Sequence, residues 1–494
     1  MVSTLGTLYG PSVALLTDLY QLTMAYSYWK SASSDKEAVF HLFFRKAPFH
    51  NGITIACGLH YTIDFLKRFH FDKSDIEYLS TLLGADKKPL FSPEFLDYLG
   101  GLRFTCDVDC VPEGTVVFPQ EPLLRIQGPI VECQLLETAL LNIWNFQTLI
   151  ATKANRIRQS AGSDPVLEFG CRRAQGADGA LTASWAAHIG GCDSSSNVLA
   201  GKVFGIPVSG THAHSWVMSF DDELSAFKAY ADALPNNCVF LVDTYDTLEG
   251  VRHAIEVGKI LKSGGHKLLG IRLDSGDLAY LSIEARKLLD EAGFDDTNIV
   301  ASNDLDENII SSLNLQGAKI NVWGVGTKLV TAFDQPALGG VYKLAATREP
   351  GKDWKYTIKL SEQAAKISTP GIQQIRRFQK DGLYVADAIY DTSLELNKHV
   401  IMVDPLDQTR RRSIAPDIPY EDLLQPIFRA GKLVYSAPDR MKIKTYVNQQ
   451  LEKFHPTIRR LLNPHEYPVG LEQALHKQRT ELIMKARGTN VLGS

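Results

Sequence analysis

The feature that most constrains the fold is the alternation, between about residues 130 and 344, of short apolar segments with longer helical stretches. Neighbouring parallel strands need a crossover connection, which is usually a helix, so this alternation predicts consecutive βαβ units and a parallel sheet. Such units in succession could form either a barrel or an open, doubly wound sheet. The predicted strands are Val166–Phe169, Pro207–Ser209, Cys238–Val242, Leu268–Leu273, Ile299–Ala301 and Ile320–Trp323.

Polar residues follow nearly every one of these predicted strands. In a barrel, the carboxyl ends of the strands meet at one face and carry the active site, whereas an open sheet concentrates its ligands near one switch point. Polar groups at so many strand ends therefore favour a barrel with its active site at that face. These groups are Glu168 and Arg172, Thr211 and His214, Asp243, Arg272 and Asp274, Ser302 and Asp304, and Gly324-Val-Gly-Thr327.

The segments on either side of this region have a different sequence pattern, in which Pro and Gly separate short predicted strands. We predict that residues 1–128 and 345–438 form one discontinuous mixed α/β domain beside a barrel domain of residues 129–344. Residues 439–494 are rich in Lys, Arg, Leu and Gln, which is typical of surface helices, so we expect a helical C-terminal tail.

Composition narrows the class of protein. The 494-residue chain is 45% hydrophobic and 22% charged with a formal net charge of −4, which is an ordinary globular balance and argues against a nucleic-acid scaffold. Its seven cysteines include no CxxC pair, charged residues interrupt the apolar stretches, and the N-terminus lacks a signal-peptide pattern. We therefore expect a cytoplasmic protein that binds neither nucleic acid nor a membrane.

The segment Gly324-Val-Gly-Thr327 follows a predicted strand late in the barrel region. Glycines let backbone N–H groups approach an anion, and the start of the next helix adds a partial positive charge, so the segment is a candidate phosphate-binding turn. The alternative is a tight turn that needs glycine for its conformation alone. Ser302, in a similar turn, is a weaker candidate and could equally be a helix cap.

Arg272 and Asp274 are two residues apart on a predicted strand, so their side chains share one side. A charged pair that faces a barrel interior is costly to bury without a ligand, which favours a binding site. The alternative is that the two residues form a purely structural ion pair, which would show the same sequence pattern. Asp243 ends the preceding strand and adds a second carboxylate. Carboxylates beside a phosphate site suit Mg²⁺ or the hydroxyls of a ribose.

Gly210-Thr-His-Ala-His214 places two histidines two residues apart. If the segment is a strand, both rings face one side, an arrangement that can bind a transition metal, so a metal-dependent barrel hydrolase is a rival reading. However, the later predicted strands do not end in histidines, so only carboxylates could complete such a metal site. For His212, we favour a structural role in the protein interior.

Taken together in their order along the chain, nine motifs resemble the nicotinate phosphoribosyltransferase family. The resemblance covers about residues 15 to 480. The motifs are Leu16-Thr-Asp-Leu-Tyr-Gln-Leu-Thr-Met24, Phe44-Arg-Lys, Glu168-Phe-Gly-Cys-Arg-Arg-Ala-Gln-Gly176, Asp193-Ser-Ser-Ser-Asn197, Gly210-Thr-His-Ala-His-Ser215, Asp243-Thr-Tyr-Asp246, Arg272-Leu-Asp-Ser-Gly-Asp277, Gly324-Val-Gly-Thr327 and Gly339-Gly-Val-Tyr-Lys-Leu344.

The resemblance implies a type II phosphoribosyltransferase fold, which is an incomplete α/β barrel with a mixed α/β domain, working as a homodimer with shared active sites. It implies that nicotinate and phosphoribosyl pyrophosphate (PRPP) give nicotinate mononucleotide and pyrophosphate, the first step of NAD synthesis from nicotinate. It also implies coupling to ATP hydrolysis through a phosphorylated histidine. Mg²⁺ would arrive on PRPP and ATP, and the sequence does not identify protein ligands for it.

In the family pattern Gly-Thr-x-Ala-His-Ser, the phosphorylated histidine follows the alanine, which here makes it His214, with Asp243 and Asp274 expected to act beside it. His212 occupies the variable position. The residues expected to bind nicotinate are Tyr20 from the neighbouring subunit, Thr211, Arg272, Phe169 and Arg172, and those expected to bind PRPP are Thr327, Gly324, Gly326 and Ser302.

Nicotinamide phosphoribosyltransferase is the nearest alternative within this class of enzyme. In that family an aspartate follows the Gly-Thr pair and helps to recognise the neutral amide, whereas here His212 follows Thr211 and nothing at that position repels a carboxylate. A non-catalytic interaction protein would have no reason to place Arg, His and Asp at successive strand ends.

Overall fold

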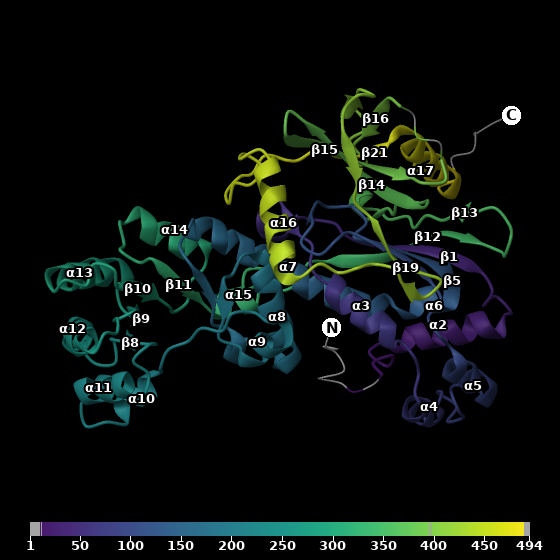
Figure 1. Ribbon diagram of the computed structural model, residues 1–494. Helices are drawn as coiled ribbons and strands as arrows, with labels where there is room; N and C mark the ends of the chain where they lie inside the picture. Colours follow the sequence, from purple (N-terminus) through teal and green to yellow (C-terminus); the bar gives the residue numbers. More distant parts are fainter. Residues whose placement is uncertain (1–9, 11, 395, 397, 489–494) are drawn as a thin grey trace. The chain divides into compact units, whose positions relative to one another are not determined.

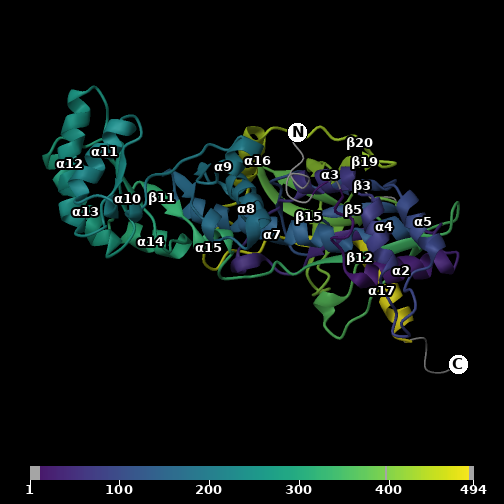
Figure 2. The same ribbon diagram turned by 90° about the horizontal axis from the view of Figure 1, so that it is seen from below.

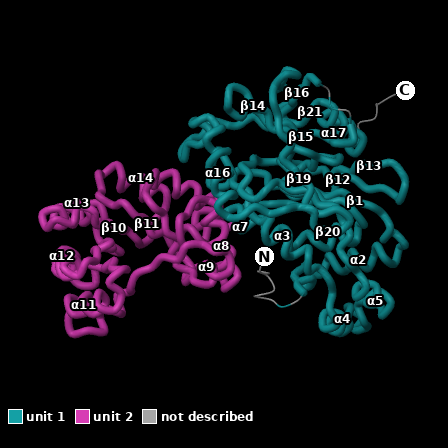
Figure 3. Tube along the Cα trace, in the orientation of Figure 1, with its two compact units in different colours: residues 1–149, 337–494 teal, residues 150–336 magenta. Residues whose placement is uncertain are grey.

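The computed structural model describes residues 10, 12–394, 396 and 398–488. The chain divides into two compact units (Figure 3): a discontinuous unit of residues 1–149 and 337–494, and an inserted unit of residues 150–336. The sequence places these boundaries instead at residues 128/129 and 344/345. The first boundary observed in the structure, at residues 149/150, falls within helix α7 (Glu137–Ala161). The helical pattern of the sequence is continuous there, so it gives no sign of a division.

The inserted unit is built on one six-stranded sheet in the order β7-β6-β11-β10-β9-β8, with every neighbouring pair parallel. Helices α12 and α13 pack against β9 (Figure 1), and α12 also packs against α11 and α13 (Figure 2). The strands are β6 (Val166–Glu168), β7 (Ser194–Ser195), β8 (Val239–Leu241), β9 (Gly270–Leu273), β10 (Asn298–Ala301) and β11 (Val322–Val325). The helices are α8 (Gly176–Gly190), α9 (Val198–Phe204), α10 (His214–Met218), α11 (Glu223–Ala233), α12 (Thr247–Ser263), α13 (Leu278–Glu291), α14 (Glu307–Leu315) and α15 (Thr327–Val330).

Aspartates start three of the crossover helices. Asp246, Asp277 and Asp306 are the N-cap residues of α12, α13 and α14, and each side chain accepts a hydrogen bond from a backbone N–H of the first turn. Such caps satisfy N–H groups that have no partner within the helix. Each cap follows a strand within a few residues, so the short loops between strand and helix are held close to the carboxyl ends of the strands.

The mixed α/β class is confirmed, and the inserted sheet is open, with β7 and β8 at its edges. The predicted strand at residues 207–209 does not form. Val208 makes only an isolated parallel bridge with Ser195. Polar and small residues surround this position, so few side chains are available to pack a further strand against its neighbours.

The larger sheet of the discontinuous unit has seven strands in the order β13-β12-β1-β5-β3-β19-β20, and its neighbouring pairs are antiparallel. A two-stranded sheet joins β2 (Thr54–Ile55) to β4 (Val116–Val117). The seven strands are β1 (Glu37–Phe44), β3 (Asp107–Cys110), β5 (Leu124–Pro129), β12 (Gly340–Arg348), β13 (Lys355–Tyr356), β19 (Gln425–Arg429) and β20 (Lys432–Leu433). The helices before α7 are α2 (Leu19–Lys30), α3 (Leu59–Arg68), α4 (Lys73–Ser80), α5 (Pro93–Gly101) and α6 (Ile130–Leu135).

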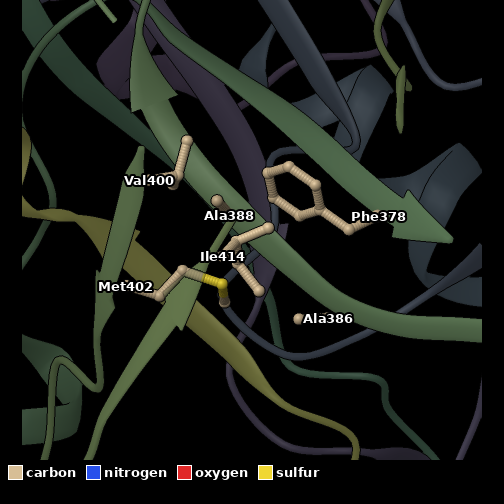
Figure 4. Packing of buried hydrophobic residues seen from close by; sticks show 6 residues of the cluster. All are labelled: Phe378, Ala386, Ala388, Val400, Met402 and Ile414. Carbon is tan, nitrogen blue, oxygen red and sulfur yellow. The ribbon is translucent and has the colours of Figure 1, made fainter. Parts of the chain in front are cut away.

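The remaining sheet has the order β17-β16-β21-β15-β14-β18 and carries its own apolar core. Phe378, Ala388, Val400, Met402 and Ile414 pack together there (Figure 4). The strands are β14 (Gln373–Lys380), β15 (Leu383–Asp391), β16 (Val400–Val403), β17 (Arg411–Ile414), β18 (Tyr420–Asp422) and β21 (Val469–Glu472).

The C-terminal tail is only partly helical, and the expectation of surface helices alone is wrong. It contains α16 (Arg440–Lys453) and α17 (Gln473–Ala486), but β21 between them lies inside the sheet, parallel to β15 and antiparallel to β16. A strand of four residues among charged helices gives too short an apolar pattern to be recognised. No helix in the part of the chain that the structure describes is long and apolar enough to cross a membrane.

Candidate active site

Arg272 and Thr211 are brought together at the carboxyl end of β9. The Arg272 guanidinium donates a hydrogen bond from Nη1 to Thr211 Oγ1 at 2.6 Å, although the two residues are 61 positions apart. Burial lowers the pKa of Arg272, an effect opposed by the carboxylates of Asp274 and Asp243. The Nε of Arg272 is buried and hydrogen-bonds to no group of the described chain. The Thr211 hydroxyl in turn donates to His212 O at 3.2 Å, so it fixes the guanidinium, whose remaining N–H groups suit a small carboxylate.

Asp243, Asp274 and Ser302 form a network across the ends of β8, β9 and β10. Asp243 Oδ2 accepts hydrogen bonds from the Asp274 backbone N–H at 3.0 Å and from the Ser275 hydroxyl at 2.5 Å. The Ser302 hydroxyl donates to Asp274 Oδ1. Asp243 Oδ1 is buried without a partner in the described chain. The expected gathering of polar strand ends therefore exists for these three residues.

His214 is the first residue of α10 and is 40% exposed on its side chain. Its Nδ1 lies 3.2 Å from Thr244 Oγ1, and its Nε2 lies 3.7 Å from Asp274 Oδ2. One ring nitrogen is thus held by a hydroxyl while the other faces a carboxylate. Sequence reasoning does not identify Thr244, because a threonine between two acidic residues has no distinctive spacing.

His212 is buried among aromatic side chains. It packs against Phe227, Tyr230 and Phe240, and its Nε2 accepts a hydrogen bond from the Leu241 backbone N–H at 3.3 Å. Burial lowers the pKa of His212 to about 4.

Both rings are expected to face one side only if the segment is a strand, and residues 209–213 do not form one, so the two-residue alternation does not apply. His212 Nε2 is also occupied by a backbone N–H, and the ring is buried among aromatic side chains, which argues against the metal-hydrolase hypothesis. Among the described residues, no cluster of three or more His, Cys, Asp or Glu side chains could hold a metal ion.

The Glu168–Arg172 segment connects β6 to the neighbourhood of the glycine turn. Glu168 is buried, and its carboxylate accepts hydrogen bonds from Gly170 N–H and from the hydroxyls of Ser184 and Ser195. These bonds occupy Glu168, so Asp274 and Thr244, rather than Glu168, are the polar neighbours of His214. Arg172 is exposed in a short 3-10 helix, yet its charge contributes to lowering the pKa of Arg272.

The glycine turn lies at the carboxyl end of β11, where Gly326 is the N-cap of α15 and Thr327 its first residue. Phe169 crosses this turn and donates its backbone N–H to Val325 O at 2.8 Å. A Cβ atom added to Gly324 would lie 2.7 Å from Phe169 Cδ2, so only glycine leaves room for the ring. The glycine at position 324 therefore allows the Phe169 ring to pack directly against the turn.

Tyr20 belongs to helix α2 of the discontinuous unit, where its side chain is 49% exposed. Leu16, Leu19 and Met24 are exposed on the same segment. A half-exposed aromatic ring among exposed apolar side chains is available to contact a ligand or another protein surface.

Three family models match the chain. Residues 15–145 match the nicotinate phosphoribosyltransferase N-terminal domain, residues 165–404 match the nicotinate phosphoribosyltransferase family, and residues 373–479 match the C-terminal domain of that family.

Known relatives and solved structures agree with these models. The nicotinate phosphoribosyltransferase of Bacillus subtilis is 46% identical over 96% of each chain, and the human one is 35% identical over 93% of this chain and 95% of its own. The crystal structure of human nicotinic acid phosphoribosyltransferase superimposes with a TM-score of 0.82 at 32% identity, covering 94% of this chain and 99% of that one. With matches of this extent along nearly its whole length, the chain belongs to the nicotinate phosphoribosyltransferase family.

Proposed function

We propose that this protein is a nicotinate phosphoribosyltransferase, which joins nicotinate to the ribosyl carbon of PRPP and releases pyrophosphate. The product, nicotinate mononucleotide, is the first intermediate of NAD synthesis from nicotinate. The observation that carries the proposal is the Arg272 guanidinium, held by a 2.6 Å hydrogen bond to Thr211 Oγ1 beside the Asp243–Asp274–Ser302 network. Two relatives that are 46% and 38% identical to the chain are named nicotinate phosphoribosyltransferase.

Nicotinate is a planar aromatic anion, so its site needs a cation for the carboxylate and an aromatic face for the ring. Arg272 would supply the cation for the carboxylate, and the Thr211 hydroxyl would donate to it by turning away from His212 O. Phe169 and Arg172 follow β6, which β11 and β10 separate from β9 in the sheet, and the charge of Arg172 acts on Arg272 across that edge. Tyr20 would supply a second aromatic face from the neighbouring subunit. The unsatisfied Nε of Arg272 is a further donor that a substrate carboxylate would satisfy.

PRPP carries phosphate groups at both ends of its ribose. The 5′-phosphate would bind the glycine turn at Gly324, Gly326 and Thr327, where the backbone can approach an anion closely. Ser302 would contribute through its hydroxyl and through its hold on Asp274. The oxygen atoms of Asp243 and Asp274, one of them buried without a partner, are of the type that Mg²⁺ prefers. Mg²⁺ carried by the substrate would neutralise the charge of the departing pyrophosphate there.

His214 is the proposed site of ATP coupling. Thr244 holds Nδ1, which leaves Nε2 to attack the γ-phosphorus of ATP, forming an N–P bond as the bond to ADP breaks. Water would later hydrolyse this bond and release phosphate. A phosphoryl group on Nε2 would place negative charge next to the Asp274 carboxylate, which now lies 3.7 Å away. Phosphorylation would therefore change the affinity of the site for its anionic substrates, as coupling requires.

We further infer that the six-stranded sheet is the wall of an incomplete barrel whose active site lies at its carboxyl edge. The enzyme would work in the cytoplasm as a homodimer that shares residues between active sites. The cysteines support a reducing compartment, since the seven cysteines, all within the described residues, form no disulfide and six of them are buried. Exposed apolar side chains on α2 support a contact with a second subunit.

The test is a coupled assay that compares nicotinate with nicotinamide, each with PRPP and Mg²⁺, in the presence and absence of ATP. We expect a strong preference for nicotinate and stimulation by ATP. The residue after Thr211 is a buried histidine whose ring is turned towards Leu241, so no carboxylate is present there to select the amide. Equal kcat/KM values for the acid and the amide would refute the proposal.

A further inference from the structure

Helix α15 follows the turn that we propose holds the PRPP phosphate, and it has only four residues. A helix of one turn is not stable in water on its own, because the cost of nucleation is not recovered by so few hydrogen bonds. The position of Gly326 and Thr327 must therefore depend on contacts that α15 makes with other elements.

The first of these contacts is an ion pair between Lys328 and Asp306. Lys328 Nζ donates to Asp306 Oδ2 at 2.7 Å, and the Asp306 side chain is only 5% exposed. The hydrogen bond from Lys328 to Asp306 raises the pKa of Lys328, so the lysine is charged at neutral pH. The other Asp306 oxygen, Oδ1, accepts from the backbone N–H groups of Asn308 and Ile309 at 2.9 and 2.8 Å. A single carboxylate thus fixes the first turns of both α14 and α15.

The far end of the α15 segment is held by a second set of charges. Asp334 accepts from Lys153, whose side chain is fully buried on α7. Lys153 also pairs at 2.8 Å with Glu307, the residue after Asp306, and Arg156 donates to the same carboxylate at 2.6 Å. The segment from Lys328 to Asp334 is therefore clamped at both ends to the start of α14 and to α7.

We infer that Asp306 and Lys328 are a positioning pair for the turn formed by Gly324–Thr327. The pair holds the backbone of this turn in the geometry that binds phosphate, and neither side chain contacts the substrate itself. The inference rests on the proposed function, since the phosphate in question is that of PRPP. Pre-formed backbone donors bind an anion without the cost of ordering a loop, so loosening the pair should weaken PRPP binding specifically.

The experiment uses substitutions that remove the charge and keep the shape. Asp306→Asn retains a good N-cap for α14 because asparagine caps as well as aspartate does. Lys328→Met removes the cation, and Lys328→Arg retains it. The matched control is Lys267→Met, which breaks an exposed ion pair of similar length, 2.8 Å to Asp296, at a distance from the turn in sequence.

We expect Asp306→Asn and Lys328→Met each to raise the KM for PRPP by roughly tenfold, the scale of one lost positioning interaction. The KM for nicotinate and the kcat at saturation should change by less than about twofold, because the donors for nicotinate are untouched. The double variant should be no worse than either single variant, since both remove the same pair. Lys328→Arg and Lys267→Met should resemble the unsubstituted enzyme.

Hydrogen exchange supplies a readout that does not depend on substrate. The amides of residues 324–331 should exchange faster in Asp306→Asn, with the rest of the inserted unit unchanged. Unchanged exchange in the turn would overturn the inference, as would a parallel rise in both KM values together with a lower Tm. Faster exchange with an unchanged KM for PRPP would uphold the pair as a positioning device and overturn instead the assignment of PRPP phosphate to this turn.

Discussion

Thr211 holds Arg272 in place through one hydrogen bond, which leaves the rest of the guanidinium to the substrate. Arg272→Ala should therefore remove a partly desolvated cation from the nicotinate carboxylate. We expect kcat/KM for nicotinate to fall by an amount equivalent to about 2–4 kcal/mol of transition-state stabilisation. The value for nicotinamide should fall much less, because the amide carries no charge. A variant that keeps its preference for nicotinate would show that the carboxylate is bound elsewhere.

Labelling with γ-labelled ATP should distinguish the roles of His214 and His212. His214→Ala should abolish acid-labile label and uncouple ATP hydrolysis from product formation, because no other imidazole occupies that position. His212→Ala should keep the label but lower the free energy of unfolding by about 2–3 kcal/mol, since it leaves a cavity and an unpaired backbone N–H. Label that persists in the His214 variant and disappears in the His212 variant would reverse the assignment.

The buried His212 ring should also make stability depend on pH. Its pKa is about 4 in the folded protein, below the usual value near 6.5, so the fold stabilises the neutral form. The stabilisation is complete above pH 6.5 and is lost as the pH falls towards 4, by at most about 3 kcal/mol. Denaturant unfolding of the protein and of His212→Gln at several pH values should show a shallower decline for the variant. Parallel curves would mean that His212 does not titrate differently in the two states.

At the scale of elements, the contact between β11 and the segment after β6 should govern the shape of the site. Gly324→Ala would place a methyl group 2.7 Å from the Phe169 ring and displace it. We expect the KM for nicotinate to rise by about tenfold, the effect of moving one aromatic contact, with a loss of stability of about 1–3 kcal/mol from overpacking. Gly179→Ala in α8, where a new Cβ meets nothing within 4 Å, is the control. It should leave the KM for nicotinate unchanged and raise stability by up to about 1 kcal/mol through helix propensity.

Elements of the inserted unit could be predicted where apolar strands end in polar residues. β6, β8, β9 and β10 form close to their predicted positions, and Arg272, Asp274 and Ser302 gather as their spacing indicates. The relative orientation of the His212 and His214 side chains could not be predicted, because side chains alternate between two faces only when the segment forms a strand. The Asp306–Lys328 ion pair could not be predicted either, since the two residues are 22 positions apart and meet only where the starts of α14 and α15 come together.

At the scale of the whole molecule, the shared active site of the proposed homodimer is open to a complementation test. Tyr20→Ala and His214→Ala proteins should each have low activity, because each lacks one part of every site. After subunit exchange, hybrid dimers should contain one intact site and regain part of the activity. A mixture no more active than its components, with exchange verified by differently tagged subunits, would show that Tyr20 serves its own subunit or none.

The position of β21 has a consequence for how the chain is made. Residues 469–472 lie between β15 and β16 in their sheet, although nearly the whole chain precedes them. On a translating ribosome, residues 150–336 can leave the exit tunnel and fold while that sheet still lacks its inner strand. The apolar side chains of β15 and β16 must therefore wait, exposed or held by a chaperone, until residues 469–472 have been made. A stop codon before residue 469 would leave β15 and β16 without their shared neighbour and would release a nascent chain prone to aggregation.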